Sequence, residues 1–175
     1  YQACLFHLCP KLLKYIYDVP DFFAGYIQLP RQVLGLKGAP EWPAIRALLP
    51  DPTGKRVLDL GCGFGWAARW FRQQGAKSVL GLALSRNMIQ RARAQTADCA
   101  IEYRIADLDT LVLAQAGFDI AYSALTFHYV QDFERLVREV HKCLQPGGHL
   151  VFSIEHPIFM AATDAHWISD EQGRK

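Results

Sequence analysis

The stretch "VLDLGCGFG", residues 57–65, decides the fold of this chain. An apolar run ends at Leu60, and Gly61, Gly63 and Gly65 follow before a helical pattern begins at Trp66. Glycine tolerates the backbone angles of a sharp turn and lets a ligand approach the main chain closely. The free amides at the start of the next helix point toward such a ligand. The stretch therefore predicts a strand, a glycine turn and a helix that together form a binding site.

Short apolar runs alternate with helix-like segments from residue 56 onward. The expected strands are 56–60, 78–84, 101–105, 118–123 and 149–154, and the expected helices between them are 66–74, 86–96 and 133–145. Near-continuous apolar strands are typical of a parallel sheet that is covered on both faces. This alternation predicts an α/β fold, a doubly wound and mainly parallel sheet with right-handed crossovers.

Local signals mark the ends of these helices. Ser85 and Asp132 are suited to cap two helix N-termini, and Gly75 suits a helix C-terminus. Residues 107–117 are less regular, and we expect a loop with one or two helical turns. Residues 1–55 hold seven of the nine prolines and predict a helical cap, with the best helix at 42–49, while 56–175 form the core.

Composition narrows the class of protein. The chain has 175 residues, consistent with one domain, and a net charge of +2 that argues against nucleic-acid or membrane partners. Five irregularly spaced cysteines without a C-x-x-C motif favour a reducing compartment, and so a cytoplasmic protein. Cys4 and Cys9 lie near His7, but no second pair of ligands accompanies them, so we expect no metal site.

The residues around the glycine turn indicate the kind of ligand. A dinucleotide fingerprint needs a glycine where this chain has Trp66, which disfavours a dinucleotide oxidoreductase. No Lys-Ser or Lys-Thr pair follows the glycines, so the triphosphate-binding loop is absent as well. Asp59 lies two residues before Gly61, where its carboxylate repels phosphates and attracts an ammonium or sulfonium group.

Several motifs in order resemble those of the class I, Rossmann-like S-adenosylmethionine-dependent methyltransferases, and most of all their small-molecule, ubiquinone-biosynthesis-type branch. They are "VLDLGCGFG", "LGLALSRNMIQRAR", "ADLDTL", "FDIAYSALTFHYV" and "LQPGGHLVFSIEHP". The resemblance covers about residues 40–160. It implies a sheet with strand order 3-2-1-4-5 and S-adenosyl-L-methionine as cofactor.

The resemblance also assigns roles to residues of the glycine turn. Asp59 and the turn formed by Gly61, Cys62, Gly63 and Gly65 are expected to hold the amino-acid part of the cofactor. A turn-capping role for Asp59 is the structural alternative.

Later strand ends supply the other expected contacts. Ala83 and Leu84 are expected at the ribose of the cofactor, Asp107 and the Leu108 amide at its adenine, and Ser123 and Ala124 at its methionine end. For Asp107, a loop or helix-capping role is the alternative.

Ala83 departs from the family pattern, which usually places Asp or Glu at this position for the ribose hydroxyls. A hydrogen bond to a charged group contributes about 1.5–3 kcal/mol. Losing one or two such bonds predicts a cofactor affinity that is roughly ten- to several-hundred-fold weaker. Ser85 or Asn87 can offer a neutral substitute, but neither starts from the same point of the backbone.

Length is the second departure, because the family sheet usually has two more strands after the one at 149–154. We therefore expect a core truncated at its C-terminus, with the fifth strand at an apolar edge. An uncovered edge strand invites pairing. A homodimer that covers this edge is one expected consequence.

Methyl transfer needs positioned groups and, for some acceptors, a base. His128 and His156 are the candidate catalytic residues, with Tyr129 and Glu155 as further candidates near the strand ends. The first hypothesis is a methyltransferase that acts on a small molecule. The alternative is a catalytically inactive methyltransferase-like binding or scaffold protein, which Ala83 and the short C-terminus favour.

Overall fold

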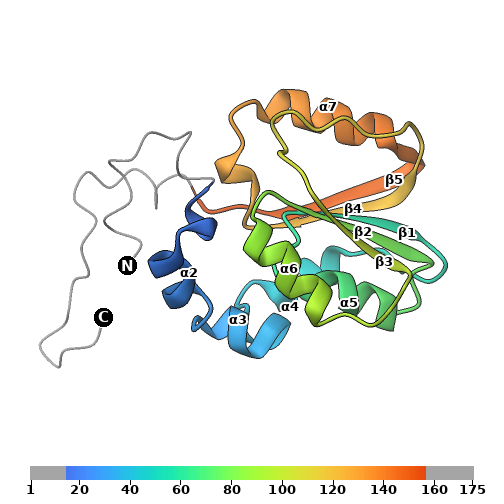
Figure 1. Ribbon diagram of the computed structural model, residues 1–175. Helices are drawn as coiled ribbons and strands as arrows, with labels where there is room; N and C mark the ends of the chain where they lie inside the picture. The colour runs from blue at the N-terminus through green and yellow to red at the C-terminus, as the bar shows by residue number, and fades with distance from the viewer. Residues whose placement is uncertain (1–14, 157–175) are drawn as a thin grey trace, which may run out of the picture.

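The computed structural model describes residues 15–156, which form a five-stranded parallel sheet flanked by helices (Figure 1). The strand order is β3-β2-β1-β4-β5, which confirms the predicted order. The strands are β1 (Arg56–Leu60), β2 (Ser78–Ala83), β3 (Ile101–Ile105), β4 (Phe118–Ala124) and β5 (Leu144–Ser153).

Strand β1 lies at the centre of the sheet and pairs on both sides. Leu58 is opposite Leu80 of β2 and Ala121 of β4. Residues 57–60 are buried, which explains why this strand reads as a continuous apolar run apart from Asp59. The centre of a parallel sheet is covered on both faces, so each side chain of β1 meets packed atoms rather than water.

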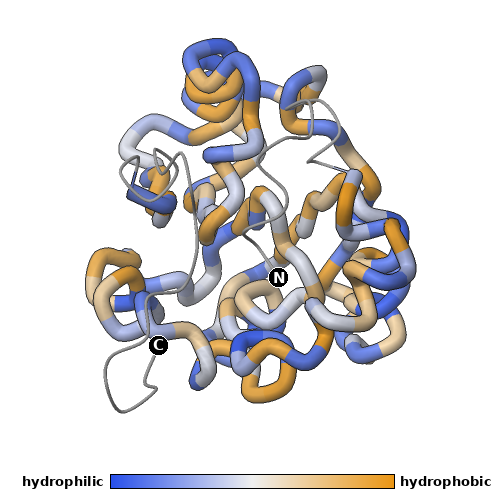
Figure 2. Tube along the Cα trace, turned by 90° about the vertical axis from the view of Figure 1, so that its left-hand side faces the viewer, coloured by the Kyte–Doolittle hydropathy of each residue, from blue (hydrophilic) through white to orange (hydrophobic). Residues whose placement is uncertain are grey.

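Helices cover the two faces of the sheet. Helices α4 (Trp42–Leu48), α5 (Trp66–Gln73) and α6 (Arg86–Ala94) lie on one face, and α7 (Phe133–Cys143) lies on the other (Figure 1). Phe71 and Ile89 belong to the core of the first face, and Leu136 and Val140 to that of the second. The coil of α7, at the top of Figure 2, carries hydrophobic and hydrophilic residues on different sides.

The predicted helix ends are confirmed by their hydrogen bonds. The Ser85 hydroxyl oxygen accepts from the Met88 amide at 3.2 Å, and Asp132 accepts from the Arg135 amide at 2.9 Å. Gly75 has φ +89°, the left-handed conformation that glycine adopts just after a helix. Each cap satisfies backbone groups that the helix leaves without an internal partner.

Two local predictions are wrong. Helix α7 ends at Cys143 rather than at residue 145, and β5 begins at Leu144, because Pro146 disfavours helical backbone in the residue before it. Residues 107–117 form a loop, as expected, but it holds isolated hydrogen-bonded turns, such as that from the Thr110 amide to the Asp107 carbonyl oxygen at 3.1 Å, rather than a segment of helix. Side chains of α7 supply hydrogen-bond partners to the backbone of this loop. Glu139 accepts from the Leu113 amide, and Arg135 donates to the Leu111 carbonyl oxygen.

Five short helices precede the sheet within the described residues. They are η1 (Ile16–Asp18), α2 (Pro20–Tyr26), α3 (Pro30–Leu34), η2 (Gly35–Gly38) and α4 (Trp42–Leu48). Proline occupies the first turn of α2, α3 and α4, where its missing N–H costs nothing. Phe23 packs against Phe64, and Gly35 packs so closely on Trp66 that a Cβ atom would lie 2.6 Å from the ring. Trp66 thus serves as a packing surface for these helices.

Among the described helices, none has the length and apolar character that a bilayer span requires. Strand β5 forms one edge of the sheet in the described part of the chain, and Phe152 on it is 39% exposed. A second copy that covers this edge stays a prediction.

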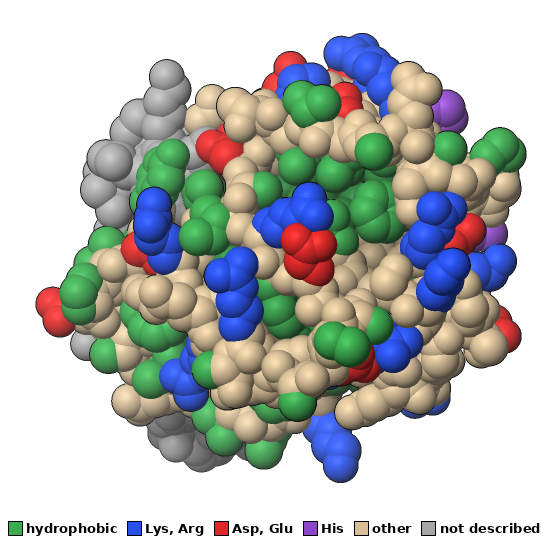
Figure 3. Space-filling view, turned by 45° about the vertical axis from the view of Figure 1, so that its right-hand side comes forward, with side chains coloured by type: hydrophobic (Ala, Val, Ile, Leu, Met, Phe, Trp, Pro, Cys, Tyr) green, Lys and Arg blue, Asp and Glu red, His purple; other side chains and the backbone are tan. Residues whose placement is uncertain are grey.

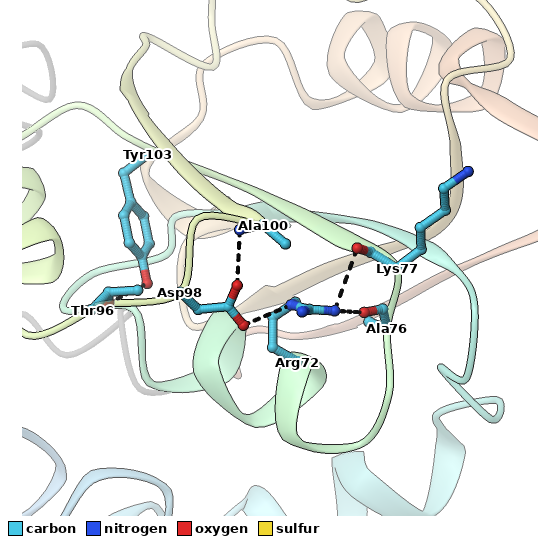
Figure 4. A network of polar contacts seen from close by, with 7 residues as sticks. All are labelled: Arg72, Ala76, Lys77, Thr96, Asp98, Ala100 and Tyr103. Carbon is cyan, nitrogen blue, oxygen red and sulfur yellow. Dashed lines mark hydrogen bonds and ion pairs between the residues drawn. The ribbon is translucent and has the colours of Figure 1, made fainter.

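A polar network fixes the end of α5 to the loop before β3 (Figure 4). The Arg72 guanidinium donates to the Asp98 carboxylate at 2.8 Å and to the carbonyl oxygens of Ala76 and Lys77. Asp98 also accepts from the Ala100 amide at 2.8 Å. One side chain therefore connects the segments that lead into β2 and β3, and so helps to set the register of both strands.

We predict that R72A lowers the free energy of unfolding by about 1–2 kcal/mol, because the carbonyl oxygens of Ala76 and Lys77 lose their donor. R104A is the matched control, since the Arg104–Glu102 pair is 59% exposed at both side chains and should contribute less than about 0.5 kcal/mol. Urea unfolding measures both values. Equal losses in the two variants would contradict the role given to Arg72.

Candidate functional site

A cavity of about 230 Å³ opens at the carboxyl ends of the strands, on the side where α2 lies (Figure 1). Its walls come from the glycine turn after β1, the ends of β2 and β4, the loop after β3 and the N-terminal helices. Ligands of doubly wound sheets bind at this edge. The predicted glycine turn, adenine loop and strand ends are therefore brought together around one space.

The glycine turn adopts left-handed backbone angles at each of its glycines. The φ values are +81° at Gly61, +52° at Gly63 and +73° at Gly65. No heavy atom lies within 4 Å of a Cβ built on Gly63, and both Gly61 and Gly63 line the cavity. Gly65 lines no described cavity and begins α5 against the Tyr103 hydroxyl. The turn thus presents open backbone to a ligand at Gly63.

Asp59 lies beneath this turn and is 2% exposed. It lines a second, smaller cavity of about 70 Å³ with Gly61, Cys62 and Trp66. One of its carboxylate oxygens has no hydrogen-bond partner among the described residues. Burial raises the pKa of Asp59 to about 7, although the Ala68 amide opposes this shift. A buried carboxylate of this kind fits a cationic partner.

The end of β2 brings Ala83 and Leu84 to the cavity, and Ser85 follows them there; their contact with a ribose stays a prediction. Ala83 is 6% exposed and offers no polar group. The only side-chain oxygen that this strand end contributes to the cavity lining is the hydroxyl of Ser85. The side chain at position 83 therefore forms part of the cavity wall but offers no hydrogen-bond acceptor.

The loop after β3 places Asp107 and Leu108 in the cavity wall, and their contact with an adenine stays a prediction. Asp107 accepts from the Asp109 amide at 3.1 Å, so part of its carboxylate is used within the loop. Arg135 of α7 donates to the carbonyl oxygens of Leu108 and, at 3.0 Å, Leu111. Sequence reasoning missed Arg135, because nothing local indicates a contact across 27 residues.

Ser123 lies elsewhere than predicted. Its side chain is completely buried inside the sheet, where the hydroxyl donates to the Leu60 carbonyl oxygen at 2.7 Å. Ala124, expected at the methionine end together with Ser123, does line the cavity, and so does Leu125. Leu125 has φ +50°, an uncommon conformation for a residue with a side chain. Successive residues of a strand point to opposite faces, which is why a shift of one position changes the surroundings.

Of the two candidate histidines, the structure places only His128 in the cavity wall. Its Nε2 lies 4.0 Å from the Glu155 carboxylate, and its Nδ1 is buried without a partner among the described residues. Burial lowers the pKa of His128 below its usual value, against the influence of Glu155. His128 is therefore neutral near pH 7 and able to accept a proton. His156 is exposed and lies outside the cavity lining.

Three tyrosines close the cavity from the side of the N-terminal helices and η3 (Phe127–Tyr129). The hydroxyl oxygens of Tyr17 and Tyr129 are 2.8 Å apart, and the ring centroids of Tyr26 and Tyr17 are 4.9 Å apart. Burial raises the pKa of Tyr26 to about 12, so its phenol stays protonated. Arg31 also lines the cavity and pairs with Glu41.

Charged side chains are dispersed on the face of the molecule that Figure 3 shows. On the face in Figure 3, Lys and Arg side chains are spread between acidic and hydrophobic groups rather than gathered in one patch. Within residues 15–156, no cluster of three or more His, Cys, Asp or Glu side chains could hold a metal ion. Cys4, His7 and Cys9 lie outside the described residues.

Comparison with known proteins gives matches along much of the chain. The profile of a family described as methyltransferase domain matches residues 58–152. A solved S-adenosylmethionine dependent methyltransferase from Mesorhizobium loti is 57% identical with a TM-score of 0.74, covering 80% of this chain and 64% of its own.

Two curated relatives are similar over a shorter part. Malonyl-[acyl-carrier protein] O-methyltransferase of Enterobacter lignolyticus is 39% identical over 63% of this chain and 43% of its own length. Phosphoethanolamine N-methyltransferase 1 of Triticum aestivum is 38% identical over 58% of this chain and 21% of its own length. The chain thus spans less than two thirds of each of these relatives.

We predict that D59N changes the pH dependence of stability. The folded chain keeps the Asp59 proton up to about pH 7, whereas the unfolded chain loses it near pH 4, so the wild type loses stability between these values. The free energy of unfolding of D59N minus that of the wild type should therefore increase by about 2–3 kcal/mol from pH 5 to pH 8.

Urea unfolding at several pH values measures this difference. D51N is the control, because the exposed Asp51 carboxyl has a lowered pKa and stays ionised across the range. A D59N difference that is the same at pH 5 and pH 8 would show that the buried carboxyl does not carry the raised pKa.

Proposed function

The chain belongs to the methyltransferase domain family, and from that premise we propose that it transfers a methyl group from S-adenosyl-L-methionine to a small-molecule acceptor. One observation carries the proposal. A single cavity joins an open glycine turn, the Asp107 loop and a neutral histidine, and a buried carboxylate lies beneath the turn. The glycine turn and the buried carboxylate suit the amino-acid end of the cofactor, and the Asp107 loop suits its adenine. The histidine suits the methyl acceptor.

The residues at the glycine turn fit the amino-acid part of the cofactor. The unpartnered oxygen of Asp59 and the open backbone at Gly63 suit an ammonium group that sits on the turn. Asp59 ionises when a cation arrives, because a positive charge stabilises the carboxylate and offsets the cost of burial. Ligand binding therefore relieves an electrostatic penalty that the free protein carries.

The loop after β3 fits the adenine. Asp107 offers a carboxylate and Leu108 an amide at the cavity wall, and Arg135 holds the carbonyl oxygen of Leu108 from behind. At the ribose, Ala83 gives no acceptor, and the proposal includes a weakened cofactor affinity for this reason. Ser123 has no direct part, since its hydroxyl is used inside the sheet.

His128 is the proposed base. When bound, the cofactor supplies an electrophilic methyl group on a sulfonium. His128 Nε2 accepts a proton from the acceptor, and Glu155, 4.0 Å away, stabilises the imidazolium that forms. The ring of Tyr129 packs against His128, and the ring of Tyr17 packs against Tyr129. The names of the relatives include an O-methyltransferase and an N-methyltransferase, so the acceptor atom is an oxygen or a nitrogen in this proposal.

The second candidate is a methyltransferase-like binding or scaffold protein without activity, which Ala83 favours. A cytoplasmic location belongs to the first proposal, in keeping with the free cysteines Cys62, Cys99 and Cys143. Calorimetry with S-adenosylmethionine and a product screen by mass spectrometry distinguish the two. Cofactor binding with a methylated product supports the enzyme, and no binding at millimolar cofactor refutes it.

We predict that H128Q lowers kcat by about 10²–10⁴-fold for an acceptor that must lose a proton. The affinity for S-adenosylmethionine should change little, because His128 acts on the acceptor. H141Q is the control, since His141 is exposed on α7 and lies outside the cavity lining. Steady-state assays with the acceptor from the screen measure kcat, and single-turnover assays give the rate of the chemical step. Full activity in H128Q would exclude His128 as the base.

A further inference from the structure

A carboxylate from the N-terminal helices lies at the corner where β2 meets α6. Asp18 Oδ1 accepts from the Ser85 hydroxyl at 2.6 Å and from the Asn87 amide at 3.2 Å. The other oxygen, Oδ2, accepts from the Arg86 amide at 3.2 Å. Asp18 is half-buried, and 67 residues separate it from Ser85. The corner that lacks an acidic residue at position 83 thus receives one from elsewhere in the chain.

Ser85 connects this carboxylate to the cavity. Ser85 is 4% exposed and lines the cavity next to Ala83 and Leu84. Its hydroxyl donates to Asp18 and accepts from the Met88 amide, so one of its two lone pairs stays available. A hydroxyl that donates to a carboxylate becomes a stronger acceptor, because the two hydrogen bonds polarise each other.

We propose that Asp18 and Ser85 act as a pair that replaces the missing strand-end carboxylate and positions the ribose hydroxyls of the cofactor. The inference rests on the proposed function, since it names a further contact of the same cofactor site. Asp18 is a positioning residue that acts through Ser85. The bonds to Arg86 and Asn87 hold the carboxylate in place while Ser85 meets the ribose.

The same contact couples the N-terminal helices to the cofactor. Tyr17 precedes Asp18 and reaches the cavity, where its hydroxyl meets that of Tyr129 at 2.8 Å. Anchoring Asp18 at the ribose corner therefore also sets the position of an aromatic wall beside His128. Ribose binding and the shape of the acceptor region become linked through two adjacent residues.

Calorimetry with S-adenosylhomocysteine and with its 2′,3′-dideoxy analogue tests the pair. D18A and S85A should each weaken S-adenosylhomocysteine binding about 5–20-fold and change binding of the dideoxy analogue less than about twofold. The double variant should lose little more than either single variant, because both act on one contact. D21A is the matched control, since Asp21 is an exposed acid in the first turn of α2, and it should change neither value.

A purely structural role of Asp18 predicts a different pattern, in which D18A weakens both ligands equally. The variant A83D separates the two explanations, because a carboxylate on β2 should restore binding in the D18A background but tighten the wild type by only a few-fold. No recovery in A83D/D18A, or unchanged binding in D18A, overturns the ribose role alone. Failure of the wild type to bind S-adenosylhomocysteine at millimolar concentration overturns the proposed function together with this inference.

Discussion

The structure depends on one electrostatic constraint, a carboxylate buried at the centre of the sheet beneath a glycine turn. Asp59 belongs to β1, which has hydrogen-bonded neighbours on both sides, and one of its oxygens is without a partner among the described residues. The left-handed glycines turn the backbone above it and leave open space at Gly63. In the folded chain the buried carboxyl stays protonated, because burial disfavours its charged form. A cationic ligand would stabilise the ionised carboxylate instead.

Elements far apart in the sequence complete the site around this centre. Arg135 of α7 donates to the carbonyl oxygens of Leu108 and Leu111, so the cavity wall that carries Asp107 and Leu108 depends on this helix. The N-terminal helices add Tyr17 and Tyr26 on the other side. The cavity therefore exists only when the sheet, α7 and the N-terminal helices are all in place, and a local change in one can reach the others.

Much of the fold could be predicted, because apolar runs and glycine turns are local signals. Four of the five strands were placed to within one residue at each end, and β5 began earlier than expected since helix α7 stopped before Pro146. The site was predicted only in part. Ser123 was misplaced because one step along a strand changes its surroundings, and Asp18, Tyr17 and Arg135 were missed because their contacts join distant segments.

A crystal structure of the protein with S-adenosylhomocysteine tests the central claim most directly. Our account places the amino group of the ligand at the glycine turn above Asp59 and its adenine between the Asp107 carboxylate and the Leu108 amide. The ribose then lies beside Ala83, within hydrogen-bond distance of the Ser85 hydroxyl. A ligand bound in another orientation, or outside this cavity, would contradict the account.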